Sequence, residues 1–260
     1  MKWRAIVLAA GRGPSDPMAA AYGVSHKCLV EIGGVPMLRR VVETLADHPS
    51  IGDIWIAIDN RDVGVQALGD AASKVTFVPT AESAARTVSS LLAQSGTGYP
   101  ILLTTADHPL LTAAMIDSFL AGSTAGAADL TVGLASAETI LAAYPDARRT
   151  FLRFGEDRVS GCNLFGLRTA NAVKAIDFWH YLEPLRKKPW RLFAAFGPMA
   201  LLRFFSGKLN LERAFAVASR RIGLVARPIL LPFADAAVDV DKPADKELAE
   251  LILKKRAAHQ

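Results

Sequence analysis

The 260-residue sequence contains only two cysteines and no long apolar run. Cys28 and Cys162 are far apart in the chain, so the sequence indicates neither a disulfide framework nor a cysteine metal site, and we expect a cytoplasmic protein. No stretch of roughly 18 uncharged apolar residues is present, so no membrane-spanning helix is expected. The N-terminal run "MKWRAIVLAAGRG" breaks at Gly11 without a cleavage-like region, which favours a strand over a signal peptide.

Two well-known nucleotide-binding signatures are also missing. Gly11 and Gly13 lack the third glycine of a dinucleotide fingerprint, and no "GK[ST]" sequence of a P-loop is present. A simple dehydrogenase or a P-loop ATPase is therefore not supported. Glycines directly after a strand still let backbone N–H groups approach an anion closely, so this turn is a candidate phosphate-binding loop.

Apolar runs alternate with amphipathic ones along the chain. The apolar runs carry hydrophobic residues on both faces, which is typical of strands buried between two layers of helices. This alternation predicts an α/β protein with a mostly parallel sheet. We predict strands over residues 3–10, 53–59, 74–79, 99–107, 129–136, 158–169 and 225–232. We predict helices over residues 35–47, 63–73, 83–94, 112–122 and 170–186, with a last helix at the C-terminus and Thr112 as an N-cap.

Charge is modest overall but unevenly distributed. The formal net charge is +5, and residues 186–227 hold ten Lys or Arg against one acid, Glu212. That window is therefore +9 and the rest of the chain is −4. An excess of this size indicates an anionic partner.

The opening loop and the lysine that follows it carry a family resemblance. "LAAGRG" and "HKCLVEIGGVPML" resemble the MobA-like NTP transferases and the sugar- and alcohol-phosphate cytidylyltransferases. The resemblance implies that Lys27 is catalytic and that the loop binds the nucleotide. The sequence differs from the family pattern in two places. His26 precedes the lysine where proline is usual, and "GPSDPMA" lacks an expected arginine. Either Arg12 supplies the charge of that arginine or Lys27 acts without it. The nucleotide-binding residues implied here are Leu8, Ala9, Ala10, Gly11, Gly13 and Lys27.

Two later segments resemble the metal-binding parts of the same family. "ILLTTADHPLLT" places Asp107 at the end of a strand, and "AVDVDKPADKELAEL" places Asp239 and Asp241 on a strand with both carboxylates on one side. The resemblance implies Mg²⁺ as cofactor, with Asp107 and Asp241 as ligands and Asp239 next; Asp107 also counts as a nucleotide contact. The alternatives are a turn or N-cap role for Asp107 and ion pairing for Asp239. Asp245 fits the first turn of the last helix.

Two further segments concern specificity. "TAESAARTVSSLL" resembles the base-reading helix start of alcohol-phosphate cytidylyltransferases, which implies contacts from Ala81, Ser83 and Thr87. Because the guanylyltransferase sequence Gly-Pro-Leu-Ala-Gly is missing, we favour CTP, with GTP as the second choice. "SGCNLFGL" resembles the acceptor-side strand and implies Gly161 and Asn163; an asparagine there would equally bond only to backbone.

The basic window allows three interpretations. In the first, residues 186–227 form a pair of interfacial helices on an anionic membrane surface. In the second, the segment covers the acceptor pocket, and Arg203 or Lys208 binds the acceptor phosphate. In the third, it is a packed helical insertion or dimer surface with a solvated basic rim. Nucleic acid is not expected as a partner, because the window carries no recognisable nucleic-acid motif.

Together these features predict a three-layer α/β/α, Rossmann-like nucleotidyltransferase fold. We expect one domain over residues 1–260, with a basic apolar helical insertion at about 170–224. The predicted reaction transfers a nucleoside monophosphate from an NTP to a small phosphorylated alcohol, acid or sugar and releases pyrophosphate. The alternatives are a glycosyltransferase-like enzyme acting on a nucleotide-sugar and a non-catalytic family member that binds a nucleotide or a membrane.

Overall fold

The computed structural model describes residues 2–11, 15–94, 98–145, 151–183 and 209–258. The residues predicted to act that lie outside these ranges are Arg12, Gly13, Arg203 and Lys208. No helix in the described part of the chain is long and apolar enough to span a membrane.

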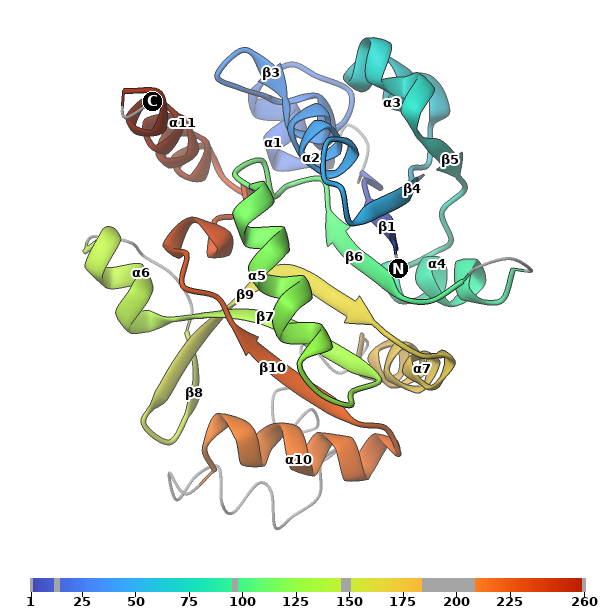
Figure 1. Cartoon of the computed structure of the whole chain (residues 1–260). Coiled ribbons are helices and arrows are strands. Elements are labelled where there is room, and N and C mark those ends of the chain that lie inside the picture. Colours follow the sequence, from blue (N-terminus) through green and yellow to red (C-terminus); the bar gives the residue numbers. More distant parts are fainter. Residues whose placement is uncertain (1, 12–14, 95–97, 146–150, 184–208, 259–260) are drawn as a thin grey trace.

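A mixed eight-stranded sheet forms the centre of the molecule (Figure 1). Its strand order is β10-β7-β9-β6-β1-β4-β5, with β8 paired to β9. All neighbouring pairs on this path are parallel except those that β9 makes with β6 and β7, which are antiparallel. The strands are β1 (Trp3–Leu8), β4 (Ile51–Ala57), β5 (Thr76–Val78), β6 (Ile101–Thr105), β7 (Leu130–Ser136), β8 (Leu152–Phe154), β9 (Asp157–Leu167) and β10 (Ala226–Leu230). A separate hairpin joins β2 (Glu31–Ile32) to β3 (Val35–Pro36).

Helices cover both faces of the sheet, as the strand composition predicts. The helices are α1 (Pro17–Ala21), α2 (Met37–Ala46), α3 (Arg61–Leu68), α4 (Ala84–Leu92), α5 (Ala113–Thr124), α6 (Ala137–Ala143), α7 (Val173–Leu182), α10 (Leu211–Ile222) and α11 (Pro243–Ala257). Residues of α2, α3 and α5 share one core cluster with Val7 and Leu102, whereas residues of α4 and α7 share a second cluster with Ile6 and Leu103. Because neighbouring residues of a strand point to opposite faces, β1 and β6 supply both clusters.

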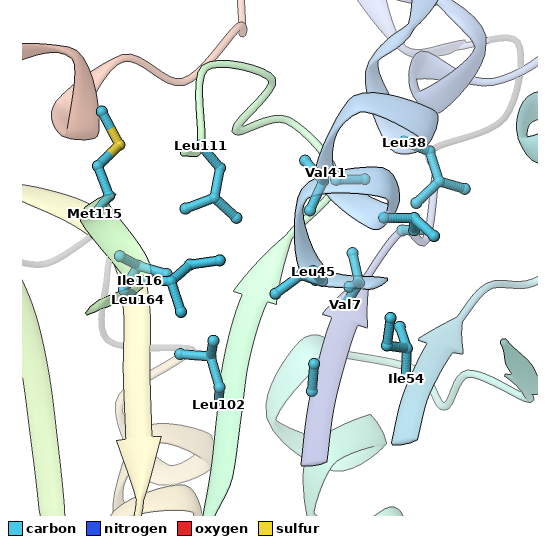
Figure 2. Close-up of a cluster of buried hydrophobic side chains, with 14 of the residues drawn as sticks. Val7, Leu38, Val41, Leu45, Ile54, Leu102, Leu111, Met115, Ile116 and Leu164 are labelled. Atoms are coloured by element: carbon cyan, nitrogen blue, oxygen red, sulfur yellow. The ribbon is translucent and has the colours of Figure 1, made fainter. Parts of the chain in front are cut away.

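The first cluster is shown in Figure 2, where side chains of α2 and α5 meet those of β1, β4, β6 and β9. Leu38, Val41 and Leu45 recur along α2 at helical spacing and are fully buried. Burying one such side chain stabilises the fold by about 1.5–3 kcal/mol. These contacts hold α2 and α5 against the sheet, and so fix the position of the loops that follow the strands.

The α/β/α prediction is confirmed, but several elements differ from the sequence-based expectation. Residues 238–241, predicted as a strand, have no strand pairing and follow a 3₁₀ helix, Ala234–Ala237. The short elements α6 and β8 were not predicted. Thr112 does cap α5, because its hydroxyl accepts a hydrogen bond from the backbone N–H of Met115.

The basic window is described only in part, since residues 184–208 lie outside the described ranges. Its described helix, α10, packs Leu211 and Phe215 against the sheet near β7 and β9. Ile222 packs against Ala175 of α7 and Ala226 of β10. The apolar side of α10 is therefore used inside the molecule, while Arg213, Arg220 and Arg221 are exposed. The membrane-contact interpretation stays a prediction about the remaining segment.

Candidate active site

The chain leaves β1 toward opposite sides of the sheet, so a topological switch point lies at the carboxyl ends of the central strands. From β1 the chain crosses to β4 and β5 on one side and then to β6 on the other. In open α/β sheets, ligands bind at such a switch point, outside the carboxyl ends of the strands. The loops after β1, β4, β5 and β6 all lie at this edge of the sheet because these strands are parallel.

Lys27 reaches this edge from a short 3₁₀ helix, Lys27–Leu29. The two residues that follow it, Cys28 and Leu29, are buried in the first core cluster, and Val30 is buried in a third cluster beneath α11. The backbone at Lys27 is therefore anchored while its side chain extends into the site, only 16% exposed.

Asp107 lies two residues after the end of β6, in a turn. The Thr105 hydroxyl donates a hydrogen bond to one carboxylate oxygen, Oδ1, over 2.6 Å. The other oxygen, Oδ2, lies 2.7 Å from the Lys27 ammonium. Asp107 thus has a turn role, as one alternative proposed, and its carboxylate also takes part in the charged cluster.

Asp241 is brought to Asp107 by the backbone of the C-terminal segment. The Val240 N–H donates to the Asp107 carbonyl over 2.9 Å, and Val238 and Val240 are buried beside α11. Asp245 accepts hydrogen bonds from the backbone N–H groups of Asp241 and Lys242, at 3.1 and 2.9 Å, which confirms its place in the first turn of α11. The turn that carries Asp241 is therefore fixed from both sides.

A second set of contacts holds the same segment from behind. The Tyr144 hydroxyl donates to Asp235, and Arg256 of α11 pairs with Asp235 at 2.7 Å. Arg256 also donates to the carbonyl of Leu110, in the loop that follows Asp107, over 3.1 Å. This network connects α6, α11 and the loop after β6, so it positions the two carboxylates relative to each other.

The Lys27 ammonium bridges the two carboxylates. Its Nζ lies 2.7 Å from Asp107 Oδ2 and 2.5 Å from Asp241 Oδ1. Burial alone would lower the pKa of Lys27, but the charges and hydrogen bonds of Asp107 and Asp241 outweigh it and raise that pKa above its ordinary value of 10.5. Among the described residues, Lys27 pairs with these two and not with Asp239, which is half-buried two positions before Asp241.

The glycine loop is joined to the lysine loop by an aspartate that sequence reasoning missed. Asp59 follows β4, and its carboxylate accepts from the Gly11 N–H at 3.4 Å and lies 3.3 Å from His26 Nε2. The Ser25 hydroxyl lies 3.1 Å from the other ring nitrogen of His26. His26, the departure from the family pattern, therefore connects the Lys27 loop to the first loop. Leu8 ends β1, and its carbonyl accepts from the Ala106 N–H. Ala9 is buried, with its N–H bonded to the Ala57 carbonyl, and Ala10 is exposed.

The predicted base-reading loop lies after β5, at the same edge. Ser83 caps α4 by accepting from the Arg86 N–H at 3.3 Å. Thr87 is 2% exposed, and its hydroxyl accepts from the Ala81 N–H and donates to the Ser83 carbonyl. This geometry makes Thr87 a support for the loop, whereas Ala81 is exposed and Ser83 half-buried.

Glu183, at the end of α7, also binds the start of α4. Its carboxylate accepts from the Ala85 N–H at 3.4 Å and lies 3.4 Å from His180 Nδ1. Burial alone would raise the pKa of Glu183, but hydrogen bonds from Ser83, His180 and Ala85 lower it below its ordinary value. A long-range contact of this kind leaves no pattern in the sequence.

The acceptor-side residues lie on an irregular part of β9. The β6–β9 ladder ends at Leu103–Phe165, and the β7–β9 register shifts between Val132 and Leu134. Asn163 lies in this bulge with φ of 49°, a left-handed conformation that few non-glycine residues adopt. Bulges are frequent beside active sites, where they redirect a side chain. Gly161 is exposed, and a Cβ there would meet no described atom within 4 Å.

A cavity of about 360 Å³ lies beyond β9, at the ends of β7 and β10. Glu138, Glu156, Asp157 and Arg158 line it, together with Ser136, Leu211 and Leu230. Because β7 and β10 are parallel and β9 starts where they end, this cavity shares the edge of the sheet that holds the charged cluster.

The donor set fits a magnesium ion only in combination with a substrate. The Asp107 and Asp241 oxygens that contact Lys27 lie within about 5 Å of each other, given their distances to the ammonium. Mg²⁺ is commonly bound by one or two carboxylates together with substrate phosphates. In the described part of the chain, no group of three His, Cys, Asp or Glu side chains could hold a metal by itself. The residues therefore fit a cation whose remaining ligands come from a nucleotide.

Strand order and site geometry together define an α/β nucleotide-binding protein. Residues 5–178 match the MobA-like NTP transferase domain, and the chain belongs to this family. No curated protein sequence matches the chain significantly.

Solved structures agree with the family assignment. A hypothetical transferase from Thermus thermophilus is 28% identical, with a TM-score of 0.78 over 95% of this chain and 100% of that one. CMP:2-keto-3-deoxy-manno-octonic acid synthetase, solved with CTP, is 15% identical, with a TM-score of 0.62 over 98% of this chain and 100% of that one. The 4-diphosphocytidyl-2C-methyl-D-erythritol synthase of Anaerococcus prevotii is 11% identical, with a TM-score of 0.58 over 97% and 99%. At their identities, the last two show the fold alone.

Proposed function

We propose that this protein is a Mg²⁺-dependent nucleotidyltransferase that joins a nucleoside monophosphate, from CTP in preference to GTP, to a small phosphorylated alcohol, acid or sugar. The observation that carries the proposal is the convergence of Lys27, Asp107 and Asp241, from three distant parts of the chain, beside the loop that contains Gly11. An ammonium and two carboxylates beside a glycine-containing loop form an arrangement suited to a metal-bound triphosphate.

In this reaction an oxygen of the acceptor phosphate attacks the α-phosphorus of the NTP. The bond from the α-phosphorus to the oxygen that bridges it to the β-phosphorus breaks, and pyrophosphate leaves. Lys27 stabilises negative charge that develops on the α- and β-phosphates. The Gly11 N–H, whose bond to Asp59 is long at 3.4 Å, would turn to a phosphate oxygen. Mg²⁺, held by Asp107 and Asp241, would add positive charge at the same oxygens.

The remaining candidate residues position the two substrates. Ala81 and Ser83 would contact the base at the start of α4, with Thr87 and Glu183 holding that loop. The redirected Asn163 and the exposed Gly161 would contact the acceptor. The roles of Arg12, Gly13, Arg203 and Lys208 stay predictions, and so does a ligand role for Asp239.

A pyrophosphate-release screen tests the proposal. Each of the four NTPs is combined with a panel of phosphorylated alcohols, acids and sugars in the presence of Mg²⁺. We expect pyrophosphate release with CTP and one acceptor class, and loss of this release in Asp107→Asn. Asp53→Asn should retain it, because the Asp53 carboxylate lies near the opposite edge of the sheet, where it pairs with Arg4. Cleavage of a nucleotide-sugar without use of free NTP would favour the glycosyltransferase-like alternative. Nucleotide binding without any turnover would favour the non-catalytic one.

A further inference from the structure

Lys27 occupies the position that a bound cation would take. Its ammonium contacts both carboxylates at 2.7 and 2.5 Å, so the oxygens best placed to bind a metal already share one positive charge. The Thr105 hydroxyl takes the other oxygen of Asp107. Inorganic Mg²⁺ would have to displace the ammonium before it could reach both carboxylates.

We propose that Lys27 and the divalent cation compete for Asp107 and Asp241, so that the metal enters this site only together with a nucleotide. This inference rests on the proposed function, because it assumes that a triphosphate binds beside Gly11. The phosphates draw the ammonium away from the carboxylates and supply the oxygen ligands that two carboxylates cannot provide.

The local structure allows such an exchange. Cys28, Leu29 and Val30 are buried and anchor the backbone after Lys27, whereas the lysine carries its ammonium on a flexible four-carbon stem. Asp107 and Asp241 are held by the Val240–Asp107 backbone bond and by Asp245, so they keep their positions when the ammonium leaves. The side chain can therefore move between carboxylates and phosphates over a fixed framework.

The exchange also explains why the site tolerates two neighbouring carboxylates in the absence of substrate. Two negative charges within about 5 Å of each other repel, and Lys27 neutralises that repulsion. A cation bound with the nucleotide takes over the same task. In the absence of a nucleotide, Lys27 thus keeps the divalent cation from binding to the two carboxylates.

The test measures Mn²⁺ binding, by electron paramagnetic resonance of free Mn²⁺, to the full chain without nucleotide. Mn²⁺ takes carboxylate and phosphate oxygens as Mg²⁺ does. We expect the wild-type protein to bind Mn²⁺ weakly and Lys27→Met to bind it at least about tenfold more tightly, which corresponds to about 1.4 kcal/mol. Addition of CTP to the wild type should produce tight Mn²⁺ binding, with more Mn²⁺ bound than CTP binds in the absence of protein.

Two variants serve as matched controls. Lys242→Met removes a positive charge one residue from Asp241 without touching the bridge, and should bind Mn²⁺ like the wild type. The double variant Lys27→Met/Asp107→Asn should lose the gain. Any of three results would overturn the proposal. Lys27→Met could bind Mn²⁺ no more tightly than the wild type, Lys242→Met could show the same gain, or the gain could persist in the double variant.

The wild-type titrations keep the test decisive if Lys27→Met does not fold. Mn²⁺ binding to the wild type that CTP leaves unchanged, after subtraction of Mn²⁺ bound by CTP itself, contradicts the exchange. The readout is also independent of turnover. A protein that shows the exchange but transfers no nucleotide refutes the proposed function alone, and an active protein without the exchange refutes this inference alone.

Discussion

Replacing Lys27 with methionine tests how strongly the charged cluster is coupled. Two unit charges about 4 Å apart interact by about 4 kcal/mol at an effective dielectric constant of 20. The Lys27 and Asp107 side chains are 16% and 24% exposed, so desolvation and residual screening reduce this figure to a net coupling of about 1–2 kcal/mol. Asp241 is 59% exposed, and its pair adds less than about 1 kcal/mol.

The coupling is measured by a double-mutant cycle in urea. Lys27→Met leaves two unpaired carboxylates that repel each other, and the added Asp107→Asn change relieves that repulsion. The double variant should therefore lose about 1–2 kcal/mol less free energy of unfolding than the sum of the single losses. Lys27→Met should also lower turnover about 10²–10³-fold while the protein stays folded. Additivity within about 0.3–0.5 kcal/mol would refute the bridging role of Lys27, and the matching cycle with Lys242→Met should be additive.

Three other substitutions probe separate parts of the account. Burial alone would raise the pKa of Asp129, but hydrogen bonds from Thr169, Val225 and Asn171 lower it below its ordinary value of 3.8. The ionised carboxylate therefore stabilises the fold above about pH 4, and this stability is lost as the pH falls through the pKa of the folded state. Asp129→Asn should thus lower the urea midpoint at pH 7, and the difference from wild type should shrink below pH 4; a constant difference contradicts this. Asn163→Gly removes the side chain but suits the positive φ, so the free energy of unfolding should stay equal or rise by up to about 1 kcal/mol. The KM for the acceptor should rise, and unchanged acceptor kinetics would remove Asn163 from the acceptor site. Thr105→Val keeps the shape but deletes the 2.6 Å bond to the Asp107 carboxylate, which should lower turnover about tenfold or more with little change in melting temperature; full activity would show that Asp107 needs no such support.

The sheet and its central site could be predicted because their signals are local or follow the order of the chain. Doubly apolar strands alternating with amphipathic helices require a covered, mostly parallel sheet, and such a sheet brings the ends of β1 and β6 together. The family resemblance pointed to Lys27 and Asp107, and their distance of 2.7 Å shows that they meet at this edge of the sheet. Asp59 stands at the end of an apolar strand as Asp107 does, so the same reasoning could have found it.

The parts that were not predicted depend on contacts between distant residues. Residues 238–241 alternate like a strand, but their burial comes from α11 and the loop after β6, with no neighbouring strand to pair with. The bulge at Asn163 arises where β9 leaves β6 while it continues beside β7, which only the assembled sheet determines. Glu183 reaches α4 from the far end of α7, and no spacing in the sequence encodes that contact.

Transfer of the α-phosphate is the most direct test of the central claim that Lys27, Asp107 and Asp241 act together on a metal-bound triphosphate. CTP labelled at the α-phosphorus is incubated with Mg²⁺ and the acceptor identified by the screen, and the labelled product and pyrophosphate are quantified. We expect one labelled product per pyrophosphate released by the wild type. Both should form at least about a hundredfold more slowly with Lys27→Met, Asp107→Asn or Asp241→Asn. Label that stays in CTP with every acceptor, or transfer at the wild-type rate by any of the three variants, would contradict the account.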